Sequence, residues 1–242
     1  MLELKNISFE VAENNEKISI IKDLSLNIEK NKLTVITGPN GSGKSTLARI
    51  IAGINRVSDG EIFFLGENIT DKSITERANL GISFAFQQPV KFKGIKVIDL
   101  LRLAAKKNLT HKDACDILSE VGLCARDYVD REVSGSLSGG ELKRIEIASV
   151  MARGALLTIF DEPEAGIDLW SFQNLIGIFE NMQKNIKDSA ILVISHQERI
   201  LNIADEIIVL NAGKIEKQGN REEILGEILN TENVAVNCDK LK

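Results

Sequence analysis

A glycine-rich segment near the N-terminus, the phosphate loop (Gly38–Ser45), has the spacing of a triphosphate-binding loop. Its sequence, Gly-Pro-Asn-Gly-Ser-Gly-Lys-Ser, fits the pattern G-x-x-x-x-G-K-[ST]. Glycines let backbone N–H groups approach a phosphate closely, and a helix N-terminus adds a partial positive charge. In such a loop Lys44 is expected to reach the β- and γ-phosphates, and Ser45 to offer its hydroxyl to Mg²⁺. The residues expected to bind nucleotide are Gly38, Pro39, Asn40, Gly41, Ser42, Gly43, Lys44, Ser45 and Thr46.

The surroundings of the phosphate loop support this interpretation over a dinucleotide-binding loop. An apolar strand is expected at Leu33–Ile36 before it and a helix at Lys44–Ile51 after it, which is the context that the motif requires. A dinucleotide loop needs G-x-G-x-x-G, and Thr46 stands where the third glycine belongs. The sequence therefore predicts a triphosphate site.

Two adjacent acids follow an apolar run, Leu156–Phe160, that is expected to be a buried strand. Asp161 is expected to hold Mg²⁺, directly or through water, and Glu162 to orient the attacking water or accept its proton. The alternative is a solvated acidic turn before Pro163. The position of the pair at a strand end, downstream of a phosphate loop, favours catalysis.

A third segment, the signature segment (Leu137–Glu141), has the sequence Leu-Ser-Gly-Gly-Glu before a helix expected at Leu142–Ala152. Ser138, Gly139 and Gly140 form a second candidate anion site at a helix N-terminus. Ser138 and Glu141 also have the spacing of a helix capping box, and both interpretations can hold at once.

The signature segment resembles the LSGGQ signature of ABC ATPases, and three further positions match that family in order. Gln87 resembles the glutamine that contacts Mg²⁺ and water. Asp168, in Ala-Gly-Ile-Asp, resembles the loop that crosses the dimer interface. His196, after Ser195, resembles the switch histidine that contacts the γ-phosphate.

The resemblance to ABC ATPases covers residues 1–220 and implies a fold, an activity and an assembly. The implied fold is an α/β P-loop NTPase with a RecA-like core, an antiparallel β subdomain and an inserted helical subdomain. The implied activity is ATP hydrolysis with Mg²⁺, in a head-to-tail homodimer whose signature segments close over the partner's ATP. The resemblance assigns catalysis to Glu162, His196, Gln87 and Lys44, Mg²⁺ to Ser45, Gln87 and Asp161, and nucleotide contacts also to Ser138, Gly139, Gly140 and Asp168.

The periodicity along the chain is typical of one such domain. Buried apolar runs between helices favour a parallel sheet with helices on both faces. We expect a nucleotide-binding core with its β subdomain at 1–88 and 152–220, a helical subdomain at 89–151, and a C-terminal helix and tail at 221–242. Further expected strands are Leu2–Phe9, Ile18–Ile21, Leu24–Ile28, Glu61–Leu65 and Ala190–Ile194, with a long helix at Leu169–Ile186 and a hairpin of Ile207–Leu210 with Lys214–Glu216.

Composition narrows the location and the partners. Of 242 residues, 43% are hydrophobic and 27% charged, and the net charge of −5 without a long basic block disfavours direct binding to nucleic acid. No apolar run reaches the ~18 residues of a membrane span, and the N-terminus lacks the layout of a signal peptide, so we expect a cytoplasmic protein that does not insert into a membrane. The three cysteines, Cys115, Cys124 and Cys238, are expected to be reduced thiols, and their role stays open.

The segment after Gln87 is more specifically similar to the SufC family, the ABC ATPases of iron–sulfur cluster assembly. The matching segments are Phe86–Val90, Ser138–Arg144 and Ser195–Leu201, while Asp161–Phe172 looks most like the short form of anaerobic bacteria and archaea. The resemblance implies a soluble SufB-like scaffold that docks at about Gln88–Leu101. The alternative is the ATP-binding subunit of a membrane importer, which docks its permease there.

One lysine of the signature helix has two interpretations. In the SufC family the position of Lys143 can pair with the catalytic carboxylate, here Glu162, and such a pair would keep the isolated subunit idle. The alternative is a solvated lysine on a helix face.

Overall fold

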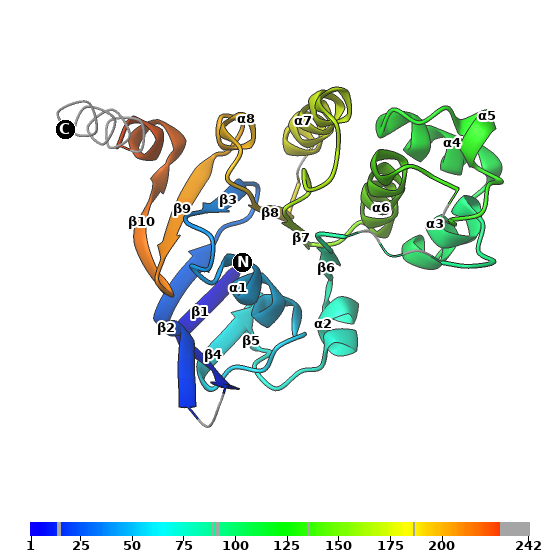
Figure 1. The fold of residues 1–242 in the computed structure, drawn as a ribbon. Coiled ribbons are helices and arrows are strands. Elements are labelled where there is room, and N and C mark those ends of the chain that lie inside the picture. The colour runs from blue at the N-terminus through cyan, green and yellow to red at the C-terminus, as the bar shows by residue number, and fades with distance from the viewer. Residues whose placement is uncertain (14–15, 89, 91, 135, 186, 228–242) are drawn as a thin grey trace.

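The main sheet has six strands in the order β10-β9-β3-β8-β7-β6 (Figure 1). The computed structural model describes residues 1–13, 16–88, 90, 92–134, 136–185 and 187–227. Five strands are parallel, and β10 closes one edge as an antiparallel hairpin with β9. Their bounds are β3 Leu33–Thr37, β6 Ile82–Ala85, β7 Leu157–Asp161, β8 Ala190–Ile194, β9 Glu206–Asn211 and β10 Lys214–Asn220.

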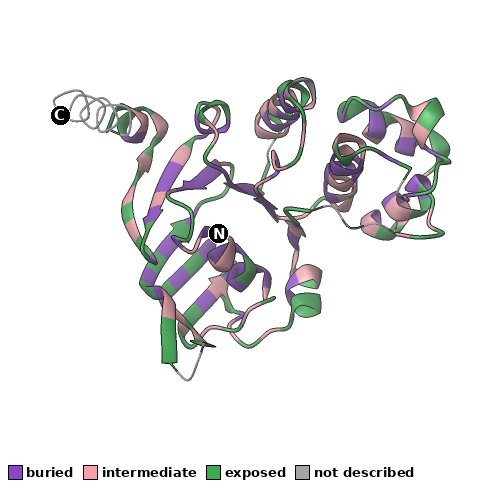
Figure 2. Ribbon diagram, in the orientation of Figure 1, coloured by how far each residue is buried: buried purple, intermediate pink, exposed green. Residues whose placement is uncertain are grey.

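The central strands of this sheet are covered on both faces, as their unbroken apolar sequences predict. Every residue of β3, β7 and β8 is buried, and Figure 2 shows these strands in purple. Successive side chains enter two different cores: Ile159 packs with α1 (Lys44–Ala52) and the second sheet, whereas Phe160 packs with helices of the opposite face. The predicted α/β fold with a parallel sheet between two helix layers is confirmed.

A second, antiparallel sheet packs against the same core as α1. Its order is β2-β1-β4-β5, with bounds β1 Leu2–Glu13, β2 Glu16–Ile28, β4 Asp59–Phe64 and β5 Glu67–Asn68. The two short strands expected at Ile18–Ile21 and Leu24–Ile28 are one strand, and its register with β1 shifts between Ile7 and Phe9. In the sequence, Lys22 and Asp23 interrupt the apolar pattern; in the structure, the strand continues through Asp23, which has φ of 49°.

Helices fill the segment between β6 and β7. They are α3 Val97–Ala105, α4 His111–Glu120, α5 Ala125–Tyr128 and α6 Gly139–Arg153. Figure 1 shows them as a group beside β6, away from the second sheet. Their apolar faces share one core, which includes Leu101, Leu118 and Ile145. On the same face of the main sheet lies α7, Leu169–Lys184.

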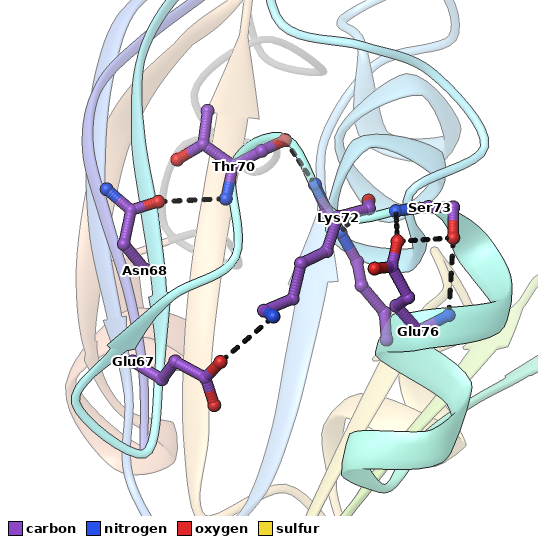
Figure 3. Close-up of polar contacts among 7 residues, drawn as sticks. Glu67, Asn68, Thr70, Lys72, Ser73 and Glu76 are labelled. Atoms are coloured by element: carbon purple, nitrogen blue, oxygen red, sulfur yellow. Dashed lines mark hydrogen bonds and ion pairs between the residues drawn. The ribbon is translucent and has the colours of Figure 1, made fainter.

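The sequence analysis missed β6 and two short helices, α2 (Ile74–Leu80) and α8 (Glu198–Leu201). Helix α2 begins with a capping box, in which Ser73 and Glu76 bond one another's backbone N–H groups (Figure 3). Just before it, Lys72 contacts Glu67 at 3.0 Å, and the N–H of Thr70 donates to Asn68 (Figure 3). These contacts order the link from the second sheet into α2.

Helix α2 is tied to the end of α1 by a buried arginine. Arg77 is 2% exposed, and its guanidinium donates to the carbonyls of Ile50 and Ile51 at 2.7 and 3.0 Å. It also donates to the carbonyls of Thr70 and Lys72. The carbonyls at a helix C-terminus have no partner within the helix, so Arg77 satisfies groups that α1 leaves open.

Some expectations fall at the limits of the described chain. The C-terminal helix expected from residue 221 is present at 221–227, and the remainder of the tail lies outside the described residues, as does Cys238. Cys115 and Cys124 are free thiols. In the described part of the chain, no helix has both the length and the apolar character for crossing a membrane.

Candidate nucleotide-binding site

The phosphate loop leaves β3 and enters α1 through two turns that require glycine. Gly38 has φ of 137°, and a Cβ there would lie 2.0 Å from the carbonyl oxygen of Leu210. Gly43, the residue before α1, has φ of 102°, and its Cβ would lie 2.7 Å from Ile21 Cδ1. A larger residue at either position would move the loop away from β9 or β2. The glycine pattern is therefore fixed by packing as well as by any ligand.

Lys44 holds its ammonium group inside the phosphate loop. The side chain is buried, and Nζ donates to the carbonyls of Gly38 and Pro39 at 2.8 and 2.9 Å. Burial lowers the pKa of Lys44, and the nearby carboxylates of Glu162 and Asp161 act in the opposite direction. The loop thus encloses a cation that a phosphate can approach.

A hollow of about 260 Å³ lies over the phosphate loop. Its lining consists of Ile20, Asn40, Gly41, Gly43, Lys44, Ser45, Thr46 and Glu162. A larger hollow, about 400 Å³, lies between α6 and α7 and contains none of the predicted site residues. The combination of a cation, backbone amides and a carboxylate identifies the smaller hollow as the candidate site. Sequence reasoning missed Ile20, because an isoleucine in an expected strand is normally predicted to belong to the hydrophobic core.

Ser45 and Asp161 meet at the edge of this hollow. The Ser45 hydroxyl donates to Asp161 Oδ1 at 2.7 Å, and Asp161 is 1% exposed. Burial raises the pKa of Asp161, which the bond from Ser45 partly opposes. Hydroxyl and carboxylate oxygens are ligands that Mg²⁺ prefers, and Mg²⁺ is usually bound by few protein groups together with substrate phosphates. The two residues therefore fit a magnesium site. Among the described residues, no three His, Cys, Asp or Glu side chains are grouped to hold a metal by themselves.

Glu162 follows β7 in a strained conformation and lines the hollow. Its φ of 45° lies in the left-handed region, which costs energy for a residue with a side chain. Its N–H donates to the carbonyl of Ile194 at 3.0 Å, so β8 helps to hold it. Gln87, in the loop after β6, donates from Nε2 to Glu162 Oε2 at 2.5 Å. The structure thus places the predicted glutamine on the predicted catalytic carboxylate, and its contact with Mg²⁺ stays a prediction.

The loop after β8 exposes His196 and buries the neighbouring Ser195. The His196 ring is exposed, and its Nε2 lies 3.4 Å from Gln197 Nε2. The buried Ser195 hydroxyl donates to Glu164 at 2.5 Å and accepts from the N–H of Gln197. Burial raises the pKa of Glu164. Sequence reasoning missed Glu164, because nothing in its type or position separated it from an ordinary acidic turn.

The signature segment forms the predicted capping box at the start of α6. Glu141 N–H donates to Ser138 Oγ at 3.2 Å, and Ser138 N–H donates to Glu141 Oε2 at 2.7 Å. The hydroxyl of Tyr128 donates to the other oxygen of Glu141. The capping interpretation is confirmed, and it leaves the nucleotide role of Ser138 a prediction.

Asp168 lies beside this segment. It accepts hydrogen bonds from the N–H and hydroxyl of Ser171 at 3.0 and 2.7 Å. A Cβ built on Gly140 would lie 3.0 Å from the Ser171 hydroxyl and 3.8 Å from the Asp168 carboxylate. The signature segment and the Asp168 loop of one chain therefore form a common surface. No residue of the signature segment lines the hollow over the phosphate loop.

The predicted pair of Lys143 with Glu162 is wrong, and so is the alternative of a solvated lysine. Lys143 is 2% exposed, and its Nζ lies 2.9 Å from Glu146, one turn along α6. The same Nζ donates to the carbonyl of Phe86 at 2.5 Å. The helix faces Lys143 toward the segment before Gln87, so Gln87, rather than Lys143, contacts Glu162.

The fold and this arrangement of a phosphate loop, a carboxylate pair and a signature segment are those of a P-loop ATPase of the ABC class. Residues 21–165 match the family model described as ABC transporter, and the chain belongs to that family. It is an ATPase that binds ATP.

Individual relatives carry several names. An uncharacterized ABC transporter ATP-binding protein of Methanocaldococcus jannaschii is 40% identical over 85% of this chain and 84% of its own length. The probable ATP-dependent transporter ycf16 of Trieres chinensis is 34% identical over 92% of each chain. The sulfate/thiosulfate import ATP-binding protein CysA 2 of Shewanella oneidensis is 32% identical over 84% of this chain and 58% of its own.

Solved cassettes have the same fold. A dimeric ATP-binding cassette in a post-hydrolysis state, bound to ADP and phosphate, has a TM-score of 0.81 at 23% identity, over 91% of this chain and 99% of its own. A second cassette of an ABC transporter has a TM-score of 0.80 at 26% identity, over 98% of each chain.

Proposed function

We propose that this chain is the ATPase subunit of a cytoplasmic iron–sulfur cluster assembly complex and drives a soluble, SufB-like scaffold. The observation that supports a partner protein is an apolar hollow of about 160 Å³ beside the loop of Gln87, where such a partner could bind. Phe86 and Val90 line it and are 41% and 47% exposed, which is large for apolar side chains. The hollow coincides with the predicted docking segment, of which Pro89 and Lys91 lie outside the described residues.

Two likenesses support the scaffold over a membrane partner. The segments around Gln87, the signature and His196 resemble the SufC family. Relatives named ycf16, which are SufC-like, match this chain over nearly its whole length and over nearly the whole length of their own chains. The ATP-binding subunit of a membrane importer is the second candidate, and the likeness to CysA 2 favours it.

The proposed reaction is attack of water on the γ-phosphorus of ATP, which yields ADP and phosphate. The phosphate loop holds the triphosphate, and Lys44 stabilises charge on its β- and γ-oxygens. Glu162 orients the water and takes its proton, while Gln87 fixes the position of the Glu162 carboxylate. His196, which is exposed and does not line the hollow, is assigned to the γ-phosphate by its resemblance to the switch histidine. Ser45, Asp161 and the amide oxygen of Gln87 would hold Mg²⁺, which would supply positive charge to the phosphates.

The proposed working unit is a homodimer that forms around ATP. The surface shared by the signature segment and the Asp168 loop lies apart from the phosphate loop of the same chain. A second copy, placed head to tail, brings Ser138, Gly139 and Gly140 to the partner's triphosphate. The dimeric relative bound to ADP and phosphate is consistent with this assembly. Closure of the pair would then move whatever protein occupies the apolar hollow.

Native purification tests the choice of partner. The tagged chain is isolated from cytosol without detergent, in parallel with Val90→Asp and with a control, Ile74→Asp, whose apolar side chain is equally exposed on α2. We expect a co-purified soluble scaffold that stimulates hydrolysis, retained by Ile74→Asp and lost with Val90→Asp. Recovery of a membrane protein, and only in detergent, would favour the importer and overturn the scaffold.

A further inference from the structure

A buried ion pair on α6 faces the loop of Gln87. Lys143 and Glu146 lie one helical turn apart and contact each other at 2.9 Å, with side chains 2% and 13% exposed. Burial raises the pKa of Glu146, and Lys143 opposes that rise. Removing two charges from water is costly, and well-packed apolar side chains of similar size are often as stable or more so. Packing alone therefore does not account for this pair.

The pair forms hydrogen bonds with both polar backbone groups of Phe86, its N–H and its carbonyl. The N–H of Phe86 donates to Glu146 Oε1 at 3.0 Å, and the carbonyl of Phe86 accepts from Lys143 Nζ at 2.5 Å. Lys143 also reaches the carbonyl of Gln87 at 3.4 Å. Strand β6 ends at Ala85, so its hydrogen-bond ladder no longer serves these groups. Apolar side chains could fill the space but could not make these bonds.

The held segment leads directly to the catalytic carboxylate. Beyond the fixed Phe86 backbone, the Gln87 side chain donates to Glu162 Oε2 at 2.5 Å. At its other end, α6 begins at Ser138 of the signature segment. Contacts thus run without a break from the signature helix, through two buried charges and one backbone, to Glu162.

We propose that the Lys143–Glu146 pair is a positioning device that sets the Gln87 amide on Glu162 and couples it to the position of α6. Both residues act through the backbone of Phe86 and neither is a catalytic residue. The effect concerns hydrolysis by the purified chain, as the proposed homodimer, and needs no scaffold protein. It rests on the proposed roles of Gln87 and Glu162.

The first test removes both charges together. In Lys143→Met/Glu146→Leu no buried charge is left unpaired, so we expect the variant to fold, with a melting temperature lowered at most by the loss of the two bonds to the Phe86 backbone. We expect kcat for ATP to fall about tenfold or more while KM changes less than about threefold, because ATP contacts are intact and only the geometry at Glu162 loosens. Wild-type turnover in this variant would overturn the proposal.

The control removes a different cation of the same helix. Arg153, at the end of α6, donates to the carbonyl of Ala78 and does not contact the loop of Gln87. Arg153→Met is therefore expected to lower stability and leave kcat unchanged. If Arg153→Met lowers kcat as much as the double variant does, the effect comes from loosening α6 in general, and the proposal fails.

The second test asks whether the pair acts through Gln87. In a Gln87→Ala background the Lys143→Met/Glu146→Leu change should reduce kcat no further, since the side chain that it positions is gone. If the fold reductions in kcat caused by Gln87→Ala and by Lys143→Met/Glu146→Leu instead multiply, the proposal is overturned. Gln87→Ala by itself separates the two ideas: if it leaves kcat unchanged, the assigned role of Gln87 fails before the pair is considered. That result would not bear on the proposed scaffold, which native purification tests separately.

Discussion

The Ser45 hydroxyl donates a 2.7 Å hydrogen bond to the Asp161 carboxylate, although the two residues are 116 positions apart in the chain. Ser45 lies in the first turn of α1, and Asp161 is the last residue of β7. The contact joins the phosphate loop to the strand that also delivers Glu162. It places two oxygen ligands of the type that Mg²⁺ prefers at one edge of the hollow.

Removing either oxygen should weaken the use of Mg²⁺. We expect Ser45→Ala to raise the MgCl₂ concentration that gives half-maximal hydrolysis about tenfold or more, since the metal site loses one of its proposed oxygen ligands. Ser45→Thr retains the hydroxyl and serves as the control. Steady-state hydrolysis against MgCl₂ at saturating ATP measures the change. An unchanged half-maximal concentration in Ser45→Ala would remove Ser45 from the metal site.

The Glu162 carboxylate should be needed for chemistry and dispensable for binding. In Glu162→Gln we expect ATP to bind and kcat to fall by about 10²-fold or more, because the amide cannot take the proton of water. Trapped ATP should hold two chains together, which light scattering after gel filtration with ATP will show. Wild-type hydrolysis would refute the assignment of the base, and a monomer with bound ATP would refute the dimer.

The buried carboxyl of Glu164 should make stability depend on pH. Burial raises its pKa above the ordinary 4.5, against the bond from Ser195 and the charge of His196, and Glu162 raises it further. The folded protein therefore keeps the proton longer than the unfolded chain, so Glu164 costs stability as pH rises from about 4.5 through the raised pKa. Glu164→Gln removes that cost.

We accordingly expect the free energy of unfolding of Glu164→Gln, relative to wild type, to increase between pH 4.5 and neutrality. Below that window the two proteins should differ by a constant amount. Urea unfolding at several pH values measures the difference, with the exposed Glu198→Gln as control. A relative stability that is flat with pH would show that Glu164 titrates normally.

Arg77 should matter more for folding than for chemistry. Arg77→Met removes the donor from two carbonyls at the end of α1 and from those of Thr70 and Lys72, which we expect to cost about 2–4 kcal/mol of unfolding free energy. Arg56, which is exposed, provides the matched Arg56→Met control, with an expected change within about 0.5 kcal/mol. Equal losses in the two variants of Arg77 and Arg56, measured by urea unfolding, would contradict this account.

Local sequence was sufficient for the elements whose pattern is unbroken. Strand Ala190–Ile194 is found at its predicted bounds, because every position is apolar and both faces are covered. Secondary structure was predicted less well where tertiary contacts determine whether an element forms. Strand β6 was missed since Ile82–Ala85 is short and becomes a strand only by pairing with β7. Helix α2 is seven residues long and depends on its capping box and on Arg77.

The sequence by itself determined which residues have the chemistry of a phosphate loop, a carboxylate pair and a signature segment, because these motifs depend on residue type at short, fixed spacing. Only the tertiary structure decided which of them touch. It placed Gln87 on Glu162, turned Lys143 toward Glu146 and Phe86, and buried Glu164 against Ser195. The physical reason is that side-chain partners far apart in sequence are set by how α6, β7 and β8 pack, and no local pattern encodes that packing.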